Sequence, residues 1–374
     1  MRPIKMVDLL GQYQRIQPEI DDSIRQVIES TEFIQGPAVR QFEQELSAYA
    51  GGTPTVTCGN GTDALQIAMM ALGLKPGDEV ILPVHTYVAT AEVIALLRLS
   101  PVFVDVNPNT FTLDPAKLEG LITSRTRAIV PVHLYGQCAD MEPILAVASQ
   151  HQLHVIEDAA QSLGARYRFR DGRQVFAGTL GTVGTTSFFP SKNLGAFGDG
   201  GAMFTREEKL AATLRMIANH GQRQKYQHDL VGVNSRLDTL QAAILRVKLR
   251  HLDEYESRRR AVADFYDAHL AGLAFLETPY RAPYSTHVFH QYTLRTRGVD
   301  RDALKDYLQK KGIPSMIYYP IPLHLQAAYR KADKPEGSFP VTEELSRSVL
   351  SLPIHTEMDE EQLSYICEAL ARFA

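Results

Sequence analysis

The chain has 374 residues and a formal net charge of -4, so it can bury a large core and gives no reason to expect nucleic acid or a membrane surface as a partner. Its three cysteines, Cys58, Cys138 and Cys367, are scattered and contain no C-x-x-C pair, which predicts neither a disulfide framework nor a metal site. Residues 88–97, among the longest apolar runs, are too short to cross a bilayer, and no charged-then-apolar leader opens the chain. We therefore expect a cytoplasmic protein.

The order of the predicted elements indicates an α/β fold. A helical segment is expected over residues 1–50, followed by a large domain over residues 51–236 with a mostly parallel sheet and helices on both faces. Residues 237–374 are expected to form a bridging helix, reaching about Leu270, and a smaller α+β domain. The strands are expected near Glu79–Leu82, Val102–Val106, Ala128–Val132, Leu153–Glu157 and Thr185–Phe189, with a return strand at Gly201–Phe204.

The first chemical motif in chain order is the glycine-rich turn at residues 58–65, which leads into an apolar helical periodicity. Unpaired amide groups and the positive end of the helix dipole converge at such a helix start and favour an anion. Gly61, Thr62 and Asp63 are therefore candidates for a phosphate site. Taken alone, the motif would be only an ordinary helix cap in most proteins.

Tyr87 follows the predicted strand Glu79–Leu82 and begins the next helix. Its ring could lie against the face of a planar cofactor. The alternative is a tyrosine that fills space in the core.

Asp158 follows an apolar strand and precedes a turn of small residues. In open α/β sheets, ligands bind at the carboxyl ends of the strands, so an acid there is a candidate cofactor contact. Pyridoxal phosphate needs such a carboxylate, which keeps its ring nitrogen protonated. A helix N-cap is the alternative role for Asp158.

Lys192 lies in a bend rich in small residues, between the apolar runs Thr185–Phe189 and Gly201–Phe204. Glycines in this bend allow the backbone to approach a bulky planar ligand. Desolvation lowers the pKa of a lysine and frees its amine to form a Schiff base with a carbonyl. Any isolated lysine in a glycine-rich turn is more often a surface residue, but Lys192 together with Asp158 predicts a pyridoxal phosphate site.

Two polar stretches allow a structural interpretation. His220 precedes the polar run Arg223–Asp229, which is predicted to be a loop, and a lone histidine is more often structural than catalytic. The run Arg258–Arg260 on the bridging helix is expected to be a solvated face.

These motifs together resemble the DegT/DnrJ/EryC1/StrS family, the fold-type I, pyridoxal-phosphate-dependent aminotransferases of nucleotide sugars. The resemblance covers essentially the whole chain and depends on many ordered matches. They are Val7–Leu9, Phe33–Pro37, Asn60–Leu65, Pro83–Tyr87, the segment around Lys192, Asn234–Asp238 and Tyr319–His324.

The resemblance implies a role for each cofactor-binding residue. Lys192 would carry the Schiff base and move the proton, and Asp158 would pair with the ring nitrogen. Gln161 would contact the ring hydroxyl and Tyr87 would stack on the ring. The remaining cofactor-binding residues would be Gly61, Thr62, Asp63, Ser187 and Asn234.

The resemblance also implies partners. The chain would form a homodimer with shared active sites, in which Asn234 and Arg236 reach into the partner's site. L-glutamate would donate the amino group, with pyridoxamine phosphate as the intermediate form of the cofactor, and a keto nucleotide sugar would accept it. The substrate-binding residues would be His220, Arg236, Tyr318, Tyr319 and His324. In this family the stretch around His220 borders the sugar site, so a structural role and a substrate-binding role are about equally supported for His220.

The turn Gly198–Gly201 is similar to that of the branch which aminates C3 of the sugar, and the chain is most similar to the aminotransferases of UDP-2-acetamido-2-deoxy-3-oxo-glucuronate. It departs from them at Tyr318, where they carry histidine, so a dTDP-3-keto-6-deoxyhexose is the alternative acceptor. Less favoured are a 4-keto sugar aminotransferase, a sugar dehydratase, which would carry histidine in place of Lys192, and a regulatory protein. An amino-acid lyase of the same fold type would leave Tyr319–His324 unexplained.

Overall fold

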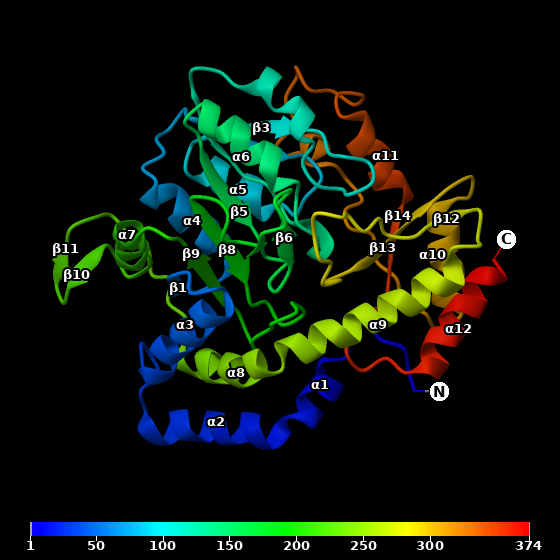
Figure 1. The fold of residues 1–374 in the computed structure, drawn as a ribbon, viewed down its shortest axis with the longest axis horizontal. Helices are drawn as coiled ribbons and strands as arrows, with labels where there is room; N and C mark the ends of the chain where they lie inside the picture. The colour runs from blue at the N-terminus through cyan, green and yellow to red at the C-terminus, as the bar shows by residue number, and fades with distance from the viewer. Residues whose placement is uncertain (1, 374) are drawn as a thin grey trace.

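The computed structural model describes residues 2–373 and shows the expected α/β architecture (Figure 1). The chain begins with three helices, α1 (Leu9–Arg15), α2 (Gln17–Ser30) and α3 (Pro37–Tyr49). In Figure 1 they lie below the central sheet, and both chain ends lie on the same side of the molecule. The division into domains at residues 50 and 236 stays a prediction.

The central sheet has seven strands and is mostly parallel. Their order is β1 (Thr55–Cys58), β9 (Gly201–Phe204), β8 (Val183–Ser187), β5 (His154–Asp158), β4 (Thr126–Ile129), β2 (Glu79–Pro83) and β3 (Ser100–Val104). Only β9 runs antiparallel to its neighbours, β1 and β8, which confirms the expected return strand. The pairs from β8 to β3 are all parallel.

Three of these strands start and end earlier than the sequence predicts. Strands β3, β4 and β8 are displaced toward the N-terminus by two or three residues. The reason is that apolar residues beyond the strand ends are also buried: Val132 forms only an isolated bridge, and Phe188 packs edge-on against Phe42. Side chains stay buried beyond the last residue that pairs with the neighbouring strand, so the apolar pattern places the end of each strand too late.

Helices cover both faces of the sheet, as expected. They are α4 (Gly61–Ala71), α5 (Ala89–Leu96), α6 (Met141–Gln150) and α7 (Glu208–Ala218). Along β2, Val80 and Leu82 pack into one hydrophobic cluster with α4 and α5, whereas Ile81 packs into another with α6. Because side chains alternate along a strand, these clusters lie on opposite faces. Both faces are therefore buried, as is typical of parallel sheets.

The predicted bridging helix is two helices, α8 (Thr239–Arg250) and α9 (Leu252–Leu270). They are separated at His251, whose amide bonds to the carbonyl of Lys248. Figure 1 shows them in line below the sheet, with α9 leading to the small C-terminal sheet.

The expectation that Arg258–Arg260 forms a solvated face is wrong for Arg259. Its side chain is only 3% exposed and donates hydrogen bonds to three backbone carbonyls. Helical geometry turns Arg259 inward while its neighbours pair with acids one turn back. The acceptors are the carbonyls of Phe289, His290 and Ile354, at 3.1, 3.3 and 3.1 Å.

The small C-terminal sheet is antiparallel and consists of β12 (Leu276–Glu277), β13 (Tyr292–Thr296) and β14 (Val349–Leu352). The C-terminal helices are α10 (Arg301–Lys310), α11 (Pro340–Ser348) and α12 (Glu360–Ala371). Asp105, just beyond β3 of the large sheet, accepts hydrogen bonds from the amides of Val341 and Thr342 and from the Thr342 hydroxyl, at 3.1, 3.0 and 2.7 Å. A residue of the large sheet therefore caps a helix beside the small one.

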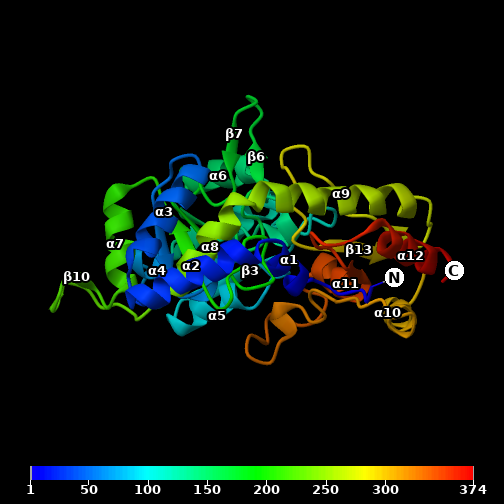
Figure 2. The ribbon, with the colours of Figure 1, turned by 90° about the horizontal axis from the view of Figure 1, so that it is seen from below.

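Short elements complete the fold. The 3₁₀ turns are η1 (Pro115–Lys117), η2 (Glu119–Leu121), η3 (Leu134–Gly136) and η4 (Leu323–Leu325). Two hairpins project from the body: β10 (Gln222–Gln224) with β11 (Gln227–His228), seen at the left of Figure 1, and β6 (Arg166–Arg168) with β7 (Gln174–Phe176), seen at the top of Figure 2. Over residues 2–373, no helix is both long and apolar enough to cross a membrane.

The second hairpin corrects the loop predicted for Arg223–Asp229. This polar run forms the antiparallel pair β10 and β11, with Tyr226 between the strands at a φ of 70°. The base of the hairpin is closed by the amide of His220, which donates to the Val233 carbonyl at 2.8 Å. We call residues 219–236 the arm.

Candidate active site

Lys192 lies in a tight turn just after β8, which we call the lysine turn (residues 188–198). The Lys192 amide donates to the carbonyl of Phe189 at 2.8 Å, and a Cβ added at Gly195 would lie 2.2 Å from the Pro190 carbonyl oxygen. Only glycine therefore fits at residue 195. Desolvation lowers the pKa of the Lys192 amine to about 8, and the nearby charge of Asp158 opposes this shift. The amine is thus partly neutral near neutral pH, as Schiff-base formation requires.

Asp158 is the last residue of β5, the parallel neighbour of β8. It is buried, and its carboxylate accepts hydrogen bonds from the Thr90 hydroxyl at 2.8 Å and the Ala160 amide at 3.2 Å. Asp158 and Lys192 therefore meet at the carboxyl edge of the sheet, as the sequence predicts. The preceding acid, Glu157, points to the other face of the strand, where it pairs with buried His133 at 2.8 Å.

Helix α4 begins beside Ser187. The side chain of Asn60 caps the helix by accepting from the Asp63 amide at 2.8 Å, so this amide is not free for an anion. A Cβ added at Gly61 would lie 2.7 Å from the Cβ of Ser187. The structure therefore brings Gly61 at the helix N-terminus and Ser187 together, with Thr62 next to them in the first turn, and a contact from Asp63 stays a prediction.

Gln161 joins the sheet edge to the Tyr318–Tyr319 segment. Its side-chain oxygen accepts from the Tyr135 amide at 2.7 Å, and its amide nitrogen donates to the Tyr319 hydroxyl at 3.2 Å. The Tyr135 hydroxyl donates to the carbonyl of Tyr318 and lies 3.1 Å from the Nε2 atom of His85. Gln161 is consequently fixed from two sides.

Tyr135 and Thr90 also contact the site residues, although no sequence motif pointed to them. Tyr135 follows the predicted strand Ala128–Val132, so it lies at the same sheet edge as Asp158. Its place after a strand could have identified it as a candidate site residue. Thr90 gives no such signal, because one threonine near a helix start is unremarkable in sequence. Burial lowers the pKa of His85, which bonds to Tyr135, to about 4, so its ring is neutral.

Tyr87 is 58% exposed, and its ring centroid lies 6.1 Å from that of Tyr319. It is not a core residue, so the space-filling alternative does not hold. The open ring beside Tyr319 is compatible with stacking on a cofactor.

The chemistry of these groups fits pyridoxal phosphate. An amine with a lowered pKa, a carboxylate fixed by Thr90 and a helix N-terminus lined by Gly61 and Ser187 are the groups that its carbonyl, ring nitrogen and phosphate need.

The predicted substrate residues are more dispersed. Tyr318 and Tyr319 lie beside Gln161, but His324 is buried elsewhere, pairing with Glu343 at 3.0 Å and packing on Phe339. This pairing accounts for His324 structurally, and a contact with substrate stays a prediction.

His220 and Asn234 belong to the exposed arm. His220 contributes backbone groups to the base of the hairpin, where its carbonyl accepts from His228 at 2.9 Å. Between Asn234 and Arg236, the Ser235 hydroxyl accepts from the Gly59 amide at 2.8 Å and so ties the end of the arm to the start of α4.

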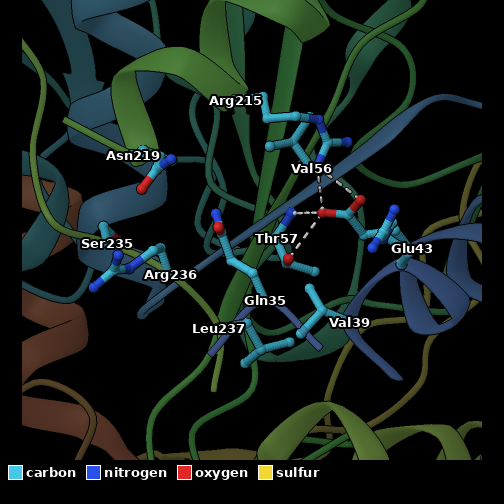
Figure 3. Close-up of a pocket in the computed structure, with 12 residues that line it drawn as sticks. Gln35, Val39, Glu43, Val56, Thr57, Arg215, Asn219, Ser235, Arg236 and Leu237 are labelled. Atoms are coloured by element: carbon cyan, nitrogen blue, oxygen red, sulfur yellow. Dashed lines mark hydrogen bonds and ion pairs between the residues drawn. The ribbon is translucent and has the colours of Figure 1, made fainter. Parts of the chain in front are cut away.

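Arg236 lines a pocket of about 260 Å³ between α3, β1 and α7 (Figure 3). Within it, Glu43 accepts hydrogen bonds from the amide and hydroxyl of Thr57 and pairs with Arg215 at 2.8 Å. Neither Lys192 nor Asp158 lines this pocket. The lining residues are Gln35, Val39, Arg40, Glu43, Val56, Thr57, Arg215, Ala218, Asn219, Ser235, Arg236 and Leu237.

The geometry around Lys192 agrees with a comparison to known proteins. The DegT/DnrJ/EryC1/StrS aminotransferase family matches residues 14–371. The chain belongs to this family. It is therefore a pyridoxal-phosphate-dependent sugar aminotransferase of the fold type that the resemblance implied.

Individual relatives are similar over nearly their full length. The UDP-2-acetamido-2-deoxy-3-oxo-D-glucuronate aminotransferase of Pseudomonas aeruginosa is 47% identical over 367 residues, which cover 98% of this chain and 99% of the relative. A protein of Geobacillus stearothermophilus named pleiotropic regulatory protein is 46% identical over 372 residues, covering 99% and 98%. The crystal structure of S. venezuelae DesV in complex with a ketimine intermediate matches with a TM-score of 0.94 at 44% identity, covering 99% of this chain and 98% of that one.

Proposed function

We propose that this aminotransferase moves the amino group of L-glutamate to the C3 keto group of a nucleotide-linked sugar, an acceptor similar to UDP-2-acetamido-2-deoxy-3-oxo-glucuronate. The observation that carries the proposal is the 47% identity, over nearly the whole of both chains, to the Pseudomonas aeruginosa enzyme named for that substrate. The product would enter the synthesis of amino sugars for cell-surface polysaccharide or lipopolysaccharide.

Lys192 and Asp158 would do the chemical work. When bound, pyridoxal phosphate supplies an electron sink for a developing carbanion. Lys192 would bind its carbonyl carbon, and an amine with a pKa of about 8 can accept and return a proton near neutral pH. Asp158, fixed by Thr90, would keep the ring nitrogen protonated.

The other residues would bind and orient. Gly61, Thr62 and Ser187 would hold the phosphate at the N-terminus of α4. Gln161 would contact the ring hydroxyl and Tyr87 would stack on the ring. Since Lys192 both holds the cofactor and moves the proton, one side chain would serve both halves of the reaction.

We also propose that the protein is a homodimer with shared active sites. Arg236 lines a pocket that contains neither Lys192 nor Asp158, and Asn234 is exposed on the arm. Side chains placed in this way are available to the active site of a second copy. The cytoplasmic location expected from the sequence stays a prediction.

A dTDP-3-keto-6-deoxyhexose is the second candidate acceptor, and Tyr318 favours it. The hydroxyl of Tyr318 is neutral, because burial raises its pKa above the usual value. A phenol in place of histidine removes a ring that can carry positive charge, so selectivity for a C6 carboxylate should fall.

A regulatory role is the alternative raised by the name of the Geobacillus stearothermophilus relative. A purely regulatory chain would not need an amine of lowered pKa beside a carboxylate. Conversion of the bound cofactor by L-glutamate separates the two functions.

The regiochemistry is tested with matched 3-keto and 4-keto nucleotide sugars, with L-glutamate as donor and kcat/KM as the measurement. We expect turnover of the 3-keto sugars, with the uronate modestly ahead of the deoxyhexose, and no useful rate on 4-keto-6-deoxy sugars. A preference for the 4-keto compound above about tenfold, roughly 1.4 kcal/mol of transition-state discrimination, would contradict the proposal.

A further inference from the structure

Helix α8 carries a buried ammonium group behind the lysine turn. Lys248 is only 2% exposed, and its Nζ donates to the carbonyl oxygen of Gly195 at 2.5 Å. Burial, with a smaller contribution from the positive charge of Arg259, lowers the pKa of Lys248 to about 8. Among the ion pairs of residues 2–373, none involves Lys248. A buried cation without a carboxylate is costly, so its position calls for an explanation other than stability.

The carbonyl that Lys248 binds belongs to the turn that carries Lys192. That turn is compact, because the Ala196 amide donates back to the Phe188 carbonyl at 2.7 Å and Gly195 lies against Pro190. Fixing the Gly195 carbonyl therefore fixes the residues on which the direction of the Lys192 side chain depends.

Two further contacts support the same turn. The side-chain oxygen of Gln241, also on α8, accepts from the Phe197 amide at 2.8 Å. The side-chain amide of Asn193 donates to the Val288 carbonyl at 3.0 Å. Of the three contacts, only that of Lys248 brings a full charge to the turn, and hydrogen bonds from charged donors are the stronger ones.

We infer that Lys248 is a positioning residue for Lys192: its buried ammonium anchors the Gly195 carbonyl and so keeps the Lys192 amine desolvated and in place. The inference rests on the proposed role of Lys192. Proton transfer by a side chain depends on placement within about 1 Å, and an error of that size costs on the order of 100-fold in rate.

The test compares Lys248→Met with a matched control, Arg246→Met. Both variants remove one cation from α8, but Arg246 pairs with Glu45 and contacts Gln41, away from the lysine turn. Methionine is an unbranched side chain only one atom shorter than lysine, and it carries no charge. Removing a buried charge also removes its desolvation cost, which offsets part of the loss of the hydrogen bond to Gly195.

The first measurement uses protein stripped of cofactor and follows the pH dependence of acetylation of Lys192 by mass spectrometry. The titratable groups that interact electrostatically with the Lys192 amine are Asp158 and His290. In the parent and in Arg246→Met, the midpoint is expected at about 8. In Lys248→Met, water enters the loosened turn, so the midpoint should move up toward the ordinary lysine value of about 10.4.

The second measurement is the half-reaction of the loaded enzyme with L-glutamate. Lys248→Met should lower the maximal rate roughly 10- to 100-fold and change the half-saturating L-glutamate concentration by less than about threefold. A variant with a lower melting temperature but an unchanged labelling midpoint and rate would make Lys248 purely structural and overturn the inference.

Two safeguards keep the outcomes separate. If Lys248→Met does not fold, Lys248→Gln removes the ammonium while keeping a polar side chain on α8, and an unchanged Lys192 midpoint in that variant also overturns the inference. Borohydride reduction of the parent enzyme followed by peptide mapping checks the proposed function on its own. A pyridoxyl label on a residue other than Lys192 refutes that role, while the cofactor-free labelling still reports on the turn.

Discussion

The side chains around Lys192 are buried and held by contacts within one chain, whereas large side chains of the arm are exposed. Asp158 and Gln161 are buried and hydrogen-bonded to Thr90, Tyr135 and Tyr319. On the arm, by contrast, the side chains of Tyr226 and Val231 are 82% and 87% exposed.

This contrast separates two kinds of functional residue. The first kind is fixed by its own chain before any ligand binds, which is the preorganisation that catalysis requires. The second kind lies on a segment whose large apolar side chains are exposed, which is typical of an interaction site. The structure of one chain can therefore explain how Asp158 and Gln161 are held, whereas the role proposed for Arg236 depends on what the arm contacts.

The largest expected effect comes from Lys192→Ala. This change removes Schiff-base exchange and proton transfer together, so turnover should fall by roughly three to six orders of magnitude. Cofactor binding should persist, because the phosphate site proposed at the start of α4 is untouched. Steady-state rates and the visible absorbance of the bound cofactor measure the two properties, and near-normal turnover would show that the site is not organised around Lys192.

A smaller effect tests the role proposed for Arg236 on the arm. If Arg236 acts across a two-fold interface, one site of each Lys192→Ala/Arg236→Ala hybrid dimer contains neither lesion. Random mixing makes half the dimers hybrids, so about a quarter of the parent activity should return. The control is each inactive variant mixed with itself. No recovery from hybrids verified by differential tagging would place Arg236 in its own subunit's site.

The smallest effect concerns a buried carboxyl on α9. Glu256 on α9 is 4% exposed, and its carboxyl lies so close to Gly164 that a Cβ added there would be 1.5 Å from the Oε1 atom. Burial raises the pKa of Glu256 to about 7, with Arg260 opposing the shift and Asp253 reinforcing it. Between pH 4.5 and 7 the folded protein therefore holds a proton that the unfolded chain releases, and stability falls as the pH rises.

Glu256→Gln should remove that fall and raise the free energy of unfolding at pH 8 by on the order of 1 to 3 kcal/mol. Urea unfolding of the cofactor-free protein from pH 4.5 to 8 measures it. Glu254→Gln, at an exposed position on the same helix, is the control and should leave the slope intact. If Glu256→Gln keeps the parent's pH dependence, burial does not raise the pKa of Glu256 in the folded protein.

The sequence could predict the parts of the site that depend on strand ends. Asp158 and Lys192 follow apolar strands, and the parallel order of β5 and β8 brings them to one edge. Gly61 could be placed at a helix start because a glycine-rich turn precedes an apolar helical periodicity. In each case the local pattern and the fold agree.

What the sequence could not predict depends on contacts between distant segments. Arg259 reads as one of three like charges, and only packing against the carbonyls of residues 289, 290 and 354 reveals that it is buried. Lys248 looks like an ordinary helix-surface lysine for the same reason. The sequence does not reveal that the helix is interrupted at His251, because the residues on both sides of it favour helix.

The cap that Asp105 provides for α11 bears on how substrates reach Lys192. To swing α11 away from the large sheet, the protein would have to break three hydrogen bonds to one carboxylate, each worth about 1.5 to 3 kcal/mol. A hinge that opens between the two sheets would thus be rarely populated. Substrate exchange should instead proceed by movements of side chains and loops on a rigid frame, so rates of entry and release should respond to changes in Tyr87 and the arm rather than to changes between the sheets.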